Sequence, residues 1–401
     1  MNVKFICNFQ NYYKSCIYCT VLFIIIDKLI DCLYNIHEID PAITNTNKEA
    51  NYMRLKKIIQ WFLKVFISGT ISIIILSAFS LLYYNNGIRK TSSTGVTDYS
   101  WSNRFYSIGY EGFAAGMYDK DGYNNSNSIP KDDIDILLMG SSQMNAYNVT
   151  PQHSTAYLLN NMMADSKLDY NLYNIGMEGH DFYICSDNLD RALNVYAPKK
   201  YVLIETRTIK LSTKSMERVL TGTRTKTPAF DSGIVYYFQK VPYFRLMYRQ
   251  LRDRFNMNDN SLNNAHSKDN SIDQNNTNTM PLLDDAYEQM LNRYLKNLEQ
   301  IAAEHHVIPI IFYIPDIMFN RDGSMQTTDD IQDISFFSKM CDKHQIEFVD
   351  LTEPFLNNYV KNKIVPFGFS NTQIGAGHLN RAGHHIIAQS LFEKIKEIEG
   401  L

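Results

Sequence analysis

The sequence predicts an α/β fold, a three-layer sandwich with a parallel sheet, preceded by one N-terminal transmembrane helix. Short apolar runs recur between residues 134 and 351, and each has the length of a buried strand. Amphipathic helical patterns separate most of these runs, and this alternation is typical of βαβ units with helices on both faces of the sheet. A much longer apolar run precedes them and predicts the membrane helix.

Five segments have the composition of strands: 134–139, 172–175, 201–205, 307–314 and 346–351. Four segments have helical spacing: 151–164, 182–196, 281–306 and 383–398. Residues 213–255 are mixed and aromatic, and we expect a helical insertion there. Residues 256–279 are dominated by Asn, Ser and Asp, which favours a disordered loop within an α/β domain spanning residues 131–400.

The apolar run at 58–84 is long enough to cross a bilayer as a helix. Arg54, Lys56 and Lys57 precede it, so the positive-inside rule predicts a cytoplasmic N-terminal side and an extracytoplasmic α/β domain. No small-x-small cleavage site follows the run, which favours a retained signal anchor in the cell membrane. Residues 91–130 are rich in Gly, Tyr, Ser and Asn, and we expect an irregular lead-in covering one edge of the domain.

The N-terminal part allows two interpretations. Met53 is followed by a basic segment and the apolar run, as at the start of a signal anchor, so residues 1–52 are expected to be an extension from a misplaced start codon. Alternatively, the apolar residues 17–26 form a second membrane segment, although the run is short for a span. In that case the two helices form a hairpin and the α/β domain faces the cytoplasm.

Charge and cysteine content exclude some classes of function. The formal net charge of −3 gives no reason to expect a nucleic-acid partner. Only Cys185 and Cys341 follow the anchor, and no cysteine spacing matches a zinc site or a disulfide framework. His305-His306 closes a predicted helix and Asp329-Asp330 begins one, so we expect neither a metal nor a cofactor.

Three motifs carry the chemistry. Gly140-Ser141-Ser142 ends the first strand, an N-x-G-x-x-G block at 174–179 follows the second, and an H-x-N-x-x-G-H block at 378–384 precedes the last helix. A hydroxyl at the carboxyl edge of a parallel sheet lies where ligands bind in such folds. A serine and a histidine together provide two parts of a nucleophilic site.

In this order, the motifs resemble those of the SGNH (GDSL-type) hydrolase superfamily. The resemblance covers residues 130–400 and is greatest to a membrane-anchored bacterial branch linked to O-acylation of cell-surface polysaccharides. It implies that Ser142 is the nucleophile and His378 the base, with the N–H groups of Ser142 and Gly179 forming the oxyanion hole. Ser141 stands where many members have the Asp of Gly-Asp-Ser.

The sequence departs from the family pattern at two places. Gly375 occupies the position three residues before the histidine where members usually have Asp, and residues 204–207 lack the usual Asn. Without its acid, a triad histidine has no partner to fix its tautomer. Three interpretations remain open: Asn371 or a backbone carbonyl orients His378, Asp316 replaces the acid, or the site only binds. Thr206 or Arg207 is the candidate replacement for the missing oxyanion donor.

The resemblance and the anchor together imply an extracytoplasmic serine esterase or O-acyltransferase acting on acyl esters of a cell-surface glycan, with a membrane acyl-donor protein as a candidate partner. The alternative is a catalytically degenerate glycan-binding or assembly subunit, which the two departures favour. A lipase or thioesterase is a second alternative, disfavoured because no long apolar run lies near the motifs.

Overall fold

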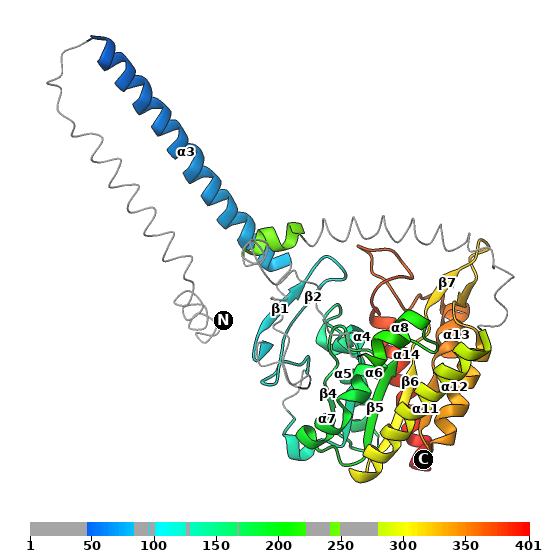
Figure 1. The fold of residues 1–401 in the computed structure, drawn as a ribbon. Helices are drawn as coiled ribbons and strands as arrows, with labels where there is room; N and C mark the ends of the chain where they lie inside the picture. Colours follow the sequence, from blue (N-terminus) through cyan, green and yellow to red (C-terminus); the bar gives the residue numbers. More distant parts are fainter. Residues whose placement is uncertain are drawn as a thin grey trace. The chain divides into compact units, whose positions relative to one another are not determined.

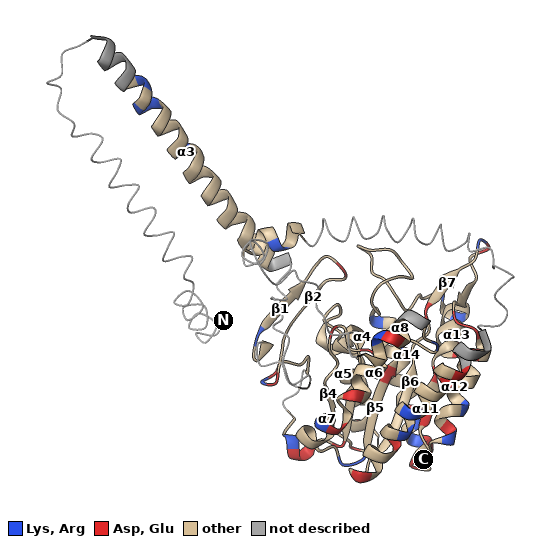
Figure 2. Ribbon diagram, viewed as in Figure 1, with Lys and Arg blue, Asp and Glu red and all other residues tan. Residues whose placement is uncertain are grey.

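The computed structural model describes residues 46–83, 96, 101–125, 129–166, 168–221, 241–248 and 280–401. Two compact units divide the chain, residues 1–72 and residues 73–401. Helix α3 (Thr46–Tyr83) contains the segment Met53–Leu81. In the part of the chain that the structure describes, this helix alone is long and apolar enough to cross a membrane. Figure 2 shows that α3 is uncharged along most of its length.

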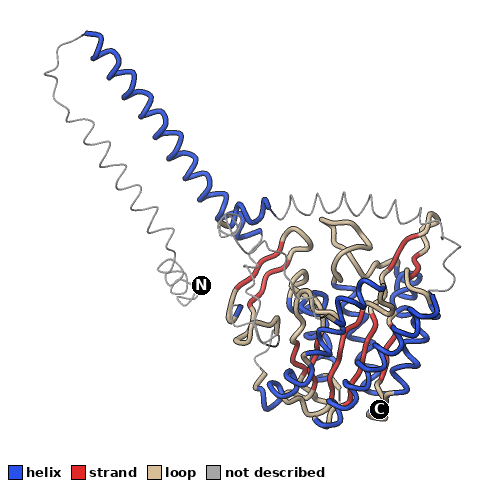
Figure 3. The backbone as a smooth tube through the Cα atoms, viewed as in Figure 1, coloured by secondary structure: helices blue, strands red, loops and turns tan. Residues whose placement is uncertain are grey.

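The second unit is built on a five-stranded sheet in which every neighbouring pair is parallel, with the strand order β4-β3-β5-β6-β9 (Figures 1 and 3). The five predicted strands are all present, with ends that differ from the prediction by one or two residues. Their bounds are β3 Ile136–Met139, β4 Leu172–Asn174, β5 Tyr201–Thr206, β6 Ile308–Tyr313 and β9 Glu347–Asp350.

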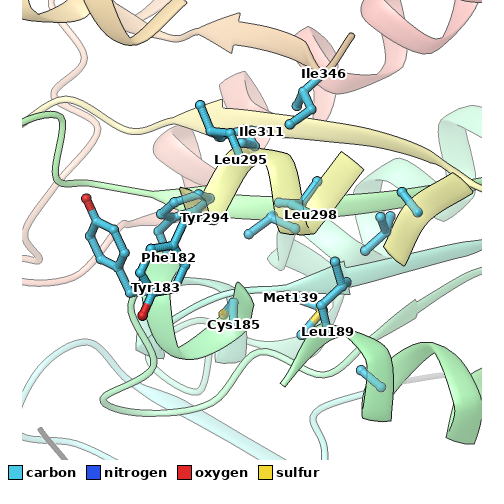
Figure 4. Close-up of a cluster of buried hydrophobic side chains, with 14 of the residues drawn as sticks. Met139, Phe182, Tyr183, Cys185, Leu189, Tyr294, Leu295, Leu298, Ile311 and Ile346 are labelled. Carbon is cyan, nitrogen blue, oxygen red and sulfur yellow. The ribbon is translucent and has the colours of Figure 1, made fainter. Parts of the chain in front are cut away.

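One face of the sheet is covered by four helices. Their apolar side chains pack with those of alternate strand residues in a single buried cluster, part of which Figure 4 shows. Leu137 and Met139 of β3 point into this cluster, as do Val202 and Ile204 of β5. The helices are α6 (Phe182–Asp187), α7 (Leu189–Tyr196), α11 (Met280–Glu304) and α12 (Ile331–Lys343).

The opposite face is covered by α5 (Thr155–Ala164), α13 (Thr352–Asn362) and α14 (Arg381–Ile398). Ile136, Leu138 and Leu203, which alternate with the residues of the first cluster, pack there against apolar residues of these helices. Because successive side chains of a strand point to opposite faces, each strand supplies both cores. The predicted three-layer α/β sandwich is therefore confirmed.

The structure also contains elements that the sequence did not predict. Residues 91–130, expected to be irregular, include an antiparallel hairpin of β1 (Phe105–Ile108) and β2 (Ala114–Met117). A second hairpin, β7 (Ile317–Phe319) with β8 (Met325–Thr327), follows β6. The predicted helix at 182–196 is divided at Asn188 into α6 and α7. Short elements complete the domain: η2 (Lys131–Asp133), α4 (Ser142–Asn145), η3 (Pro151–His153) and α8 (Thr213–Leu220).

Several expectations fall on residues outside the described ranges. They are the extension at 1–52 up to residue 45, the alternative membrane segment at 17–26, most of the insertion at 213–255, and the loop at 256–279. The domain boundaries drawn from the sequence stay predictions.

Candidate active site

The order of the sheet determines where a site is expected. The chain leaves β3 towards β4 on one side, and the neighbour of β3 on its other side is β5, which continues to β6. At such a switch point the connections diverge and leave a crevice at the carboxyl ends of the strands, where open α/β sheets bind ligands. Ser141 and Ser142 follow the end of β3 at this edge. Glu205 and Thr206, the last residues of β5, lie beside them.

Ser142 is the first residue of α4, and Ser141 is its N-cap. The Ser141 backbone is extended, and its hydroxyl accepts a hydrogen bond from the Gln143 N–H at 3.1 Å. The chain therefore turns sharply from strand to helix at the serine pair. This turn directs Ser142 Oγ to His378, whose Nε2 lies 3.0 Å away.

The other side of His378 contacts a carboxylate that the sequence analysis missed. Nδ1 of His378 lies 2.7 Å from Glu111 Oε2, and the His378 backbone N–H donates to Glu111 Oε1 at 2.7 Å. Both side chains are largely buried, with exposed fractions of 21% for His378 and 13% for Glu111. Ser142, His378 and Glu111 thus form a continuous hydrogen-bonded chain in the order of a catalytic triad.

Glu111 comes from the turn between β1 and β2, in the segment expected to be an irregular lead-in. Its only sequence signal is a carboxylate between two glycines three positions apart, Gly109 and Gly112, which flank Tyr110-Glu111. An Asp at the usual acid position would be strained and would clash with a neighbouring side chain here. Gly375 has φ +84°, and a Cβ on it would lie 2.5 Å from the Phe319 ring.

Asn371 holds the Glu111 turn and does not contact the His378 ring. Its amide donates to the carbonyls of Gly109 at 2.8 Å and Gly112 at 3.3 Å, and its Oδ1 accepts from the Gly112 N–H at 2.9 Å. Asn148 adds a bond from its amide to the Glu111 carbonyl at 2.9 Å. The expectation that Asn371 orients His378 is therefore corrected. Asn371 holds the turn that carries Glu111, and Glu111 is the residue that contacts the histidine ring.

Asp316 is likewise not the partner of His378. It forms an ion pair with Arg207, and its side chain is 54% exposed. The Arg207 guanidinium lies 5.5 Å from the centre of the Phe367 ring, and Phe367 pairs with Leu379 next to the histidine. The Thr206 hydroxyl donates to the Thr208 carbonyl at 3.1 Å. The Thr206 hydroxyl is thus occupied by a neighbouring residue of the chain, whereas Arg207 lies near the loop that carries His378.

The second glycine block lies against the nucleophile turn. The Met177 N–H donates to the Gly140 carbonyl at 2.8 Å, and Asn174 donates to the Met144 carbonyl at 2.8 Å. A Cβ on Gly176 would lie 2.7 Å from the backbone of α4, so only glycine permits this approach. Gly179 has φ +81° and open space around its Cβ position. In the described ranges, neither the Gly179 nor the Ser142 N–H donates to a backbone acceptor.

Two further residues fix the histidine loop to the rest of the site. Gln143, next to the nucleophile, accepts from the Leu379 N–H at 2.7 Å and donates to the Gly377 carbonyl at 3.4 Å. Gly383 brings α14 close to this loop, because a Cβ on it would lie 2.4 Å from the Pro366 carbonyl oxygen. Gly383 belongs to the motif at 378–384 that the sequence analysis identified, whereas nothing in the sequence predicted the contacts of Gln143.

Comparisons with known proteins give structural likenesses only. No protein-family model matches the chain, and no curated protein matches it. The solved structures that it resembles include SGNH and GDSL hydrolases and esterases.

Three examples show the extent of the likeness. The psychrotrophic esterase EstA from Pseudoalteromonas sp. is 13% identical with a TM-score of 0.35, over 66% of this chain and 98% of that one. The acetyl xylan esterase AlAXEase is 12% identical with a TM-score of 0.34, over 65% and 98%. A protein from Slackia heliotrinireducens described as an SGNH hydrolase is 11% identical with a TM-score of 0.35, over 65% and 98%. Identities this low do not transfer an activity.

Proposed function

We propose that this protein is a membrane-anchored, extracytoplasmic serine esterase or O-acyltransferase that acts on acyl esters of a cell-surface glycan. The observation that carries the proposal is the hydrogen-bonded chain from Ser142 through His378 to Glu111. The absence of an acid behind the histidine was the main sequence argument for a degenerate, binding-only site. Glu111 supplies a carboxylate at that position and removes this argument.

The first half of the reaction forms an acyl-enzyme. Ser142 Oγ attacks the carbonyl carbon of the ester, and His378 Nε2 takes the hydroxyl proton. Glu111 accepts a hydrogen bond from His378 Nδ1, which fixes the tautomer with a free Nε2 lone pair and stabilises the imidazolium. The tetrahedral intermediate then collapses, and the leaving alcohol takes the proton from His378 Nε2.

The oxyanion of each tetrahedral intermediate needs hydrogen-bond donors that are already in place. The N–H groups of Ser142 and Gly179 are the two donors in this proposal. The open space around the Gly179 Cβ position supports its place beside the reacting carbonyl. One such donor is worth roughly 3–4 kcal/mol of transition-state stabilisation.

The second half resolves the acyl-enzyme. A water or a sugar hydroxyl attacks the acyl carbonyl while His378 Nε2 takes its proton. The bond to Ser142 Oγ then breaks, and His378 Nε2 returns the proton to Oγ to restore the hydroxyl. With water the product is a carboxylic acid and the protein is an esterase. With a sugar hydroxyl the product is a new ester and the protein is an O-acyltransferase.

The glycan substrate and the extracytoplasmic location are supported by the anchor and by the sequence resemblance. Arg54, Lys56 and Lys57 of α3 precede the uncharged part of this helix, which favours a cytoplasmic N-terminus. A domain displayed outside the membrane meets cell-surface glycans. A membrane protein that delivers acyl groups is the partner that an O-acyltransferase of this kind requires.

A serine-directed fluorophosphonate probe tests the proposal on the detergent-solubilised full chain. We expect covalent labelling of the wild type and of a Ser166→Ala control, with no labelling of Ser142→Ala. Hydrolysis of p-nitrophenyl acetate is expected to fall in parallel. Labelling that persists in Ser142→Ala would refute Ser142 as the nucleophile.

The same variant tests the binding-only alternative. If the wild type is not labelled, and cells carrying Ser142→Ala keep normal acylation of their surface glycan, the degenerate binding subunit is the correct interpretation. Comparison of hydrolysis with transfer to an added oligosaccharide then separates the esterase from the O-acyltransferase.

A further inference from the structure

A second carboxylate lies at the nucleophile turn and has no place in the triad. Glu205, near the end of β5, is only 2% exposed. Removing a carboxylate from water is costly unless the protein supplies hydrogen bonds and opposite charge. The four residues that precede Glu205 in β5 are buried apolar or aromatic side chains, so Glu205 is the one charged residue of this strand.

Both oxygens of Glu205 are engaged by one residue, Ser141. The Ser141 backbone N–H donates to Oε2 and the Ser141 hydroxyl donates to Oε1, each at 2.7 Å. The same hydroxyl accepts from the Gln143 N–H. Ser141 is thereby held in its extended conformation from both sides, and the next residue is Ser142. The position of the nucleophile on α4 therefore depends on this carboxylate.

The backbone at Gly140 packs directly against the Glu205 side chain. A Cβ on Gly140 would lie 2.4 Å from Glu205 Oε2 and 2.8 Å from its Cβ. Glycine at 140 is thus required by the side chain opposite it on the neighbouring strand. The turn and Glu205 form one fitted unit at the switch point of the sheet.

The charges around Glu205 link it to the histidine. Burial raises the pKa of Glu205 above its ordinary value, while the two hydrogen bonds from Ser141 and the positive charges of Arg207 and His378 oppose this rise. Burial, together with the negative charges of Glu205 and Asp181, raises the pKa of the Cys185 thiol of α6. His378 itself contacts Glu111 on its other side and lies near the neutral His384. A protonated His378 therefore contacts one carboxylate, Glu111, and interacts electrostatically with a second, Glu205.

We propose that Glu205 is a positioning residue of the serine site: it fixes the nucleophile turn through Ser141, and its negative charge stabilises the protonated form of His378. This inference rests on the proposed serine chemistry. It assigns two separable contributions to one side chain, the geometry of the turn and the charge near the histidine.

Glu205→Gln separates charge from shape. The amide oxygen still accepts from the Ser141 N–H, and the amide nitrogen can donate to the Ser141 hydroxyl, but the charge is lost. We expect kcat for p-nitrophenyl acetate to fall at least about tenfold with little change in KM. The acidic limb of the kcat/KM profile should move to lower pH, because a negative neighbour of the imidazolium is removed. Thermal stability should be kept or raised, because a buried charge is removed.

Two further variants keep the inference testable if Glu205→Gln does not fold. Glu205→Asp retains the charge on a shorter side chain, so kcat should fall while the acidic limb stays in place. Ser141→Ala removes the hydroxyl contact alone, and it too should lower kcat without moving the acidic limb. Glu399→Gln is the matched control, because Glu399 accepts from the Tyr201 hydroxyl at the opposite end of β5.

The outcomes distinguish this inference from the proposed function. If Ser142→Ala is inactive but Glu205→Gln and Ser141→Ala match the wild type in kcat and pH profile, the role of Glu205 is refuted and the serine mechanism stands. If Glu205→Gln loses activity with an unmoved acidic limb, its charge does not act on His378. If Ser142→Ala remains fully active, the proposed function fails, whatever Glu205 does.

Discussion

At the scale of single residues, the candidate site has a carboxylate beside His378 that comes from an unexpected position in the sequence. The family pattern puts that acid three residues before the histidine, where Phe319 leaves no room for it beside Gly375. Glu111 reaches the same ring nitrogen from 267 residues upstream. A hydrogen bond depends on distance and angle, so either origin serves the chemistry equally.

The role of Glu111 predicts the effect of Glu111→Gln. A glutamine amide can donate to Nδ1, which favours the wrong tautomer and leaves Nε2 protonated towards Ser142. We expect kcat to fall by about 10²–10⁴ with a small change in KM, measured with p-nitrophenyl acetate. Glu304→Gln, at the end of α11, is the control. Activity within threefold of the wild type would mean that Glu111 does not act on His378.

His384 predicts how stability depends on pH. This side chain is 1% exposed, and its Nδ1 accepts from the Thr155 hydroxyl. Burial, followed by the nearby His378 and His153, lowers its pKa from 6.5 to about 3. The unfolded chain therefore binds one more proton than the folded chain between about pH 6.5 and 3. In that window, the free energy of unfolding decreases by about 1.4 kcal/mol for each unit by which the pH is lowered.

The measurement is urea unfolding of the detergent-solubilised protein at a series of pH values. His384→Asn keeps an acceptor for Thr155 but cannot titrate, so its stability should fall less steeply between pH 6.5 and 4. Equal slopes for the variant and the wild type would exclude His384 as the source of the acid sensitivity.

At the scale of elements, the β1–β2 hairpin completes the site and the loop before α14 holds it there. Asn371 makes three hydrogen bonds to the turn that carries Glu111, and Asn148 makes one more. On its inner side the hairpin packs in a small aromatic cluster of Trp101, Tyr106, Tyr118 and Tyr147 with Ile108. The β1–β2 hairpin is thus part of the candidate site.

Asn371→Ala should loosen the Glu111 turn without touching the triad directly. Each lost hydrogen bond is worth roughly 1 kcal/mol, so we expect kcat to fall about 10- to 100-fold. Amide exchange of residues 109–112 should accelerate, as measured by mass spectrometry. Asn357→Ala on α13 is the control. Unchanged exchange at the turn together with reduced activity would contradict a role through Glu111.

At the scale of the whole molecule, the sheet order gathers the site from distant parts of the chain. In the sheet, β3 lies between β4 and β5. The end of β3 therefore lies beside the end of β5, where Ser141 contacts Glu205. The last loop before α14 then brings His378 to the same edge. Helix α3 belongs to this scale as well, since in the proposed function it determines which compartment the site faces.

The membrane topology can be tested in intact bacterial cells that express the protein. The protein should stay in the membrane fraction after washing with carbonate. A cysteine introduced at Lys120 should react with a membrane-impermeant maleimide in intact cells, because residues after the anchor are expected outside. Reaction only after cell lysis would instead support a cytoplasmic domain, as the two-helix hairpin at residues 17–26 and 58–84 requires.

The sequence by itself determined the strands, most of the helices and the serine–histidine pairing. These follow from local patterns: apolar runs such as 307–314, the Gly140-Ser141-Ser142 strand exit, and the block at 378–384. The sequence could not determine the acid, because Glu111 lies in a segment with no periodicity and its role arises only when the hairpin packs on the loop of Asn371. It also could not assign a role to Glu205, because the sequence shows only a charged residue at the end of an apolar strand. Both roles come from contacts between residues far apart in the chain, and these exist only once the sheet has assembled.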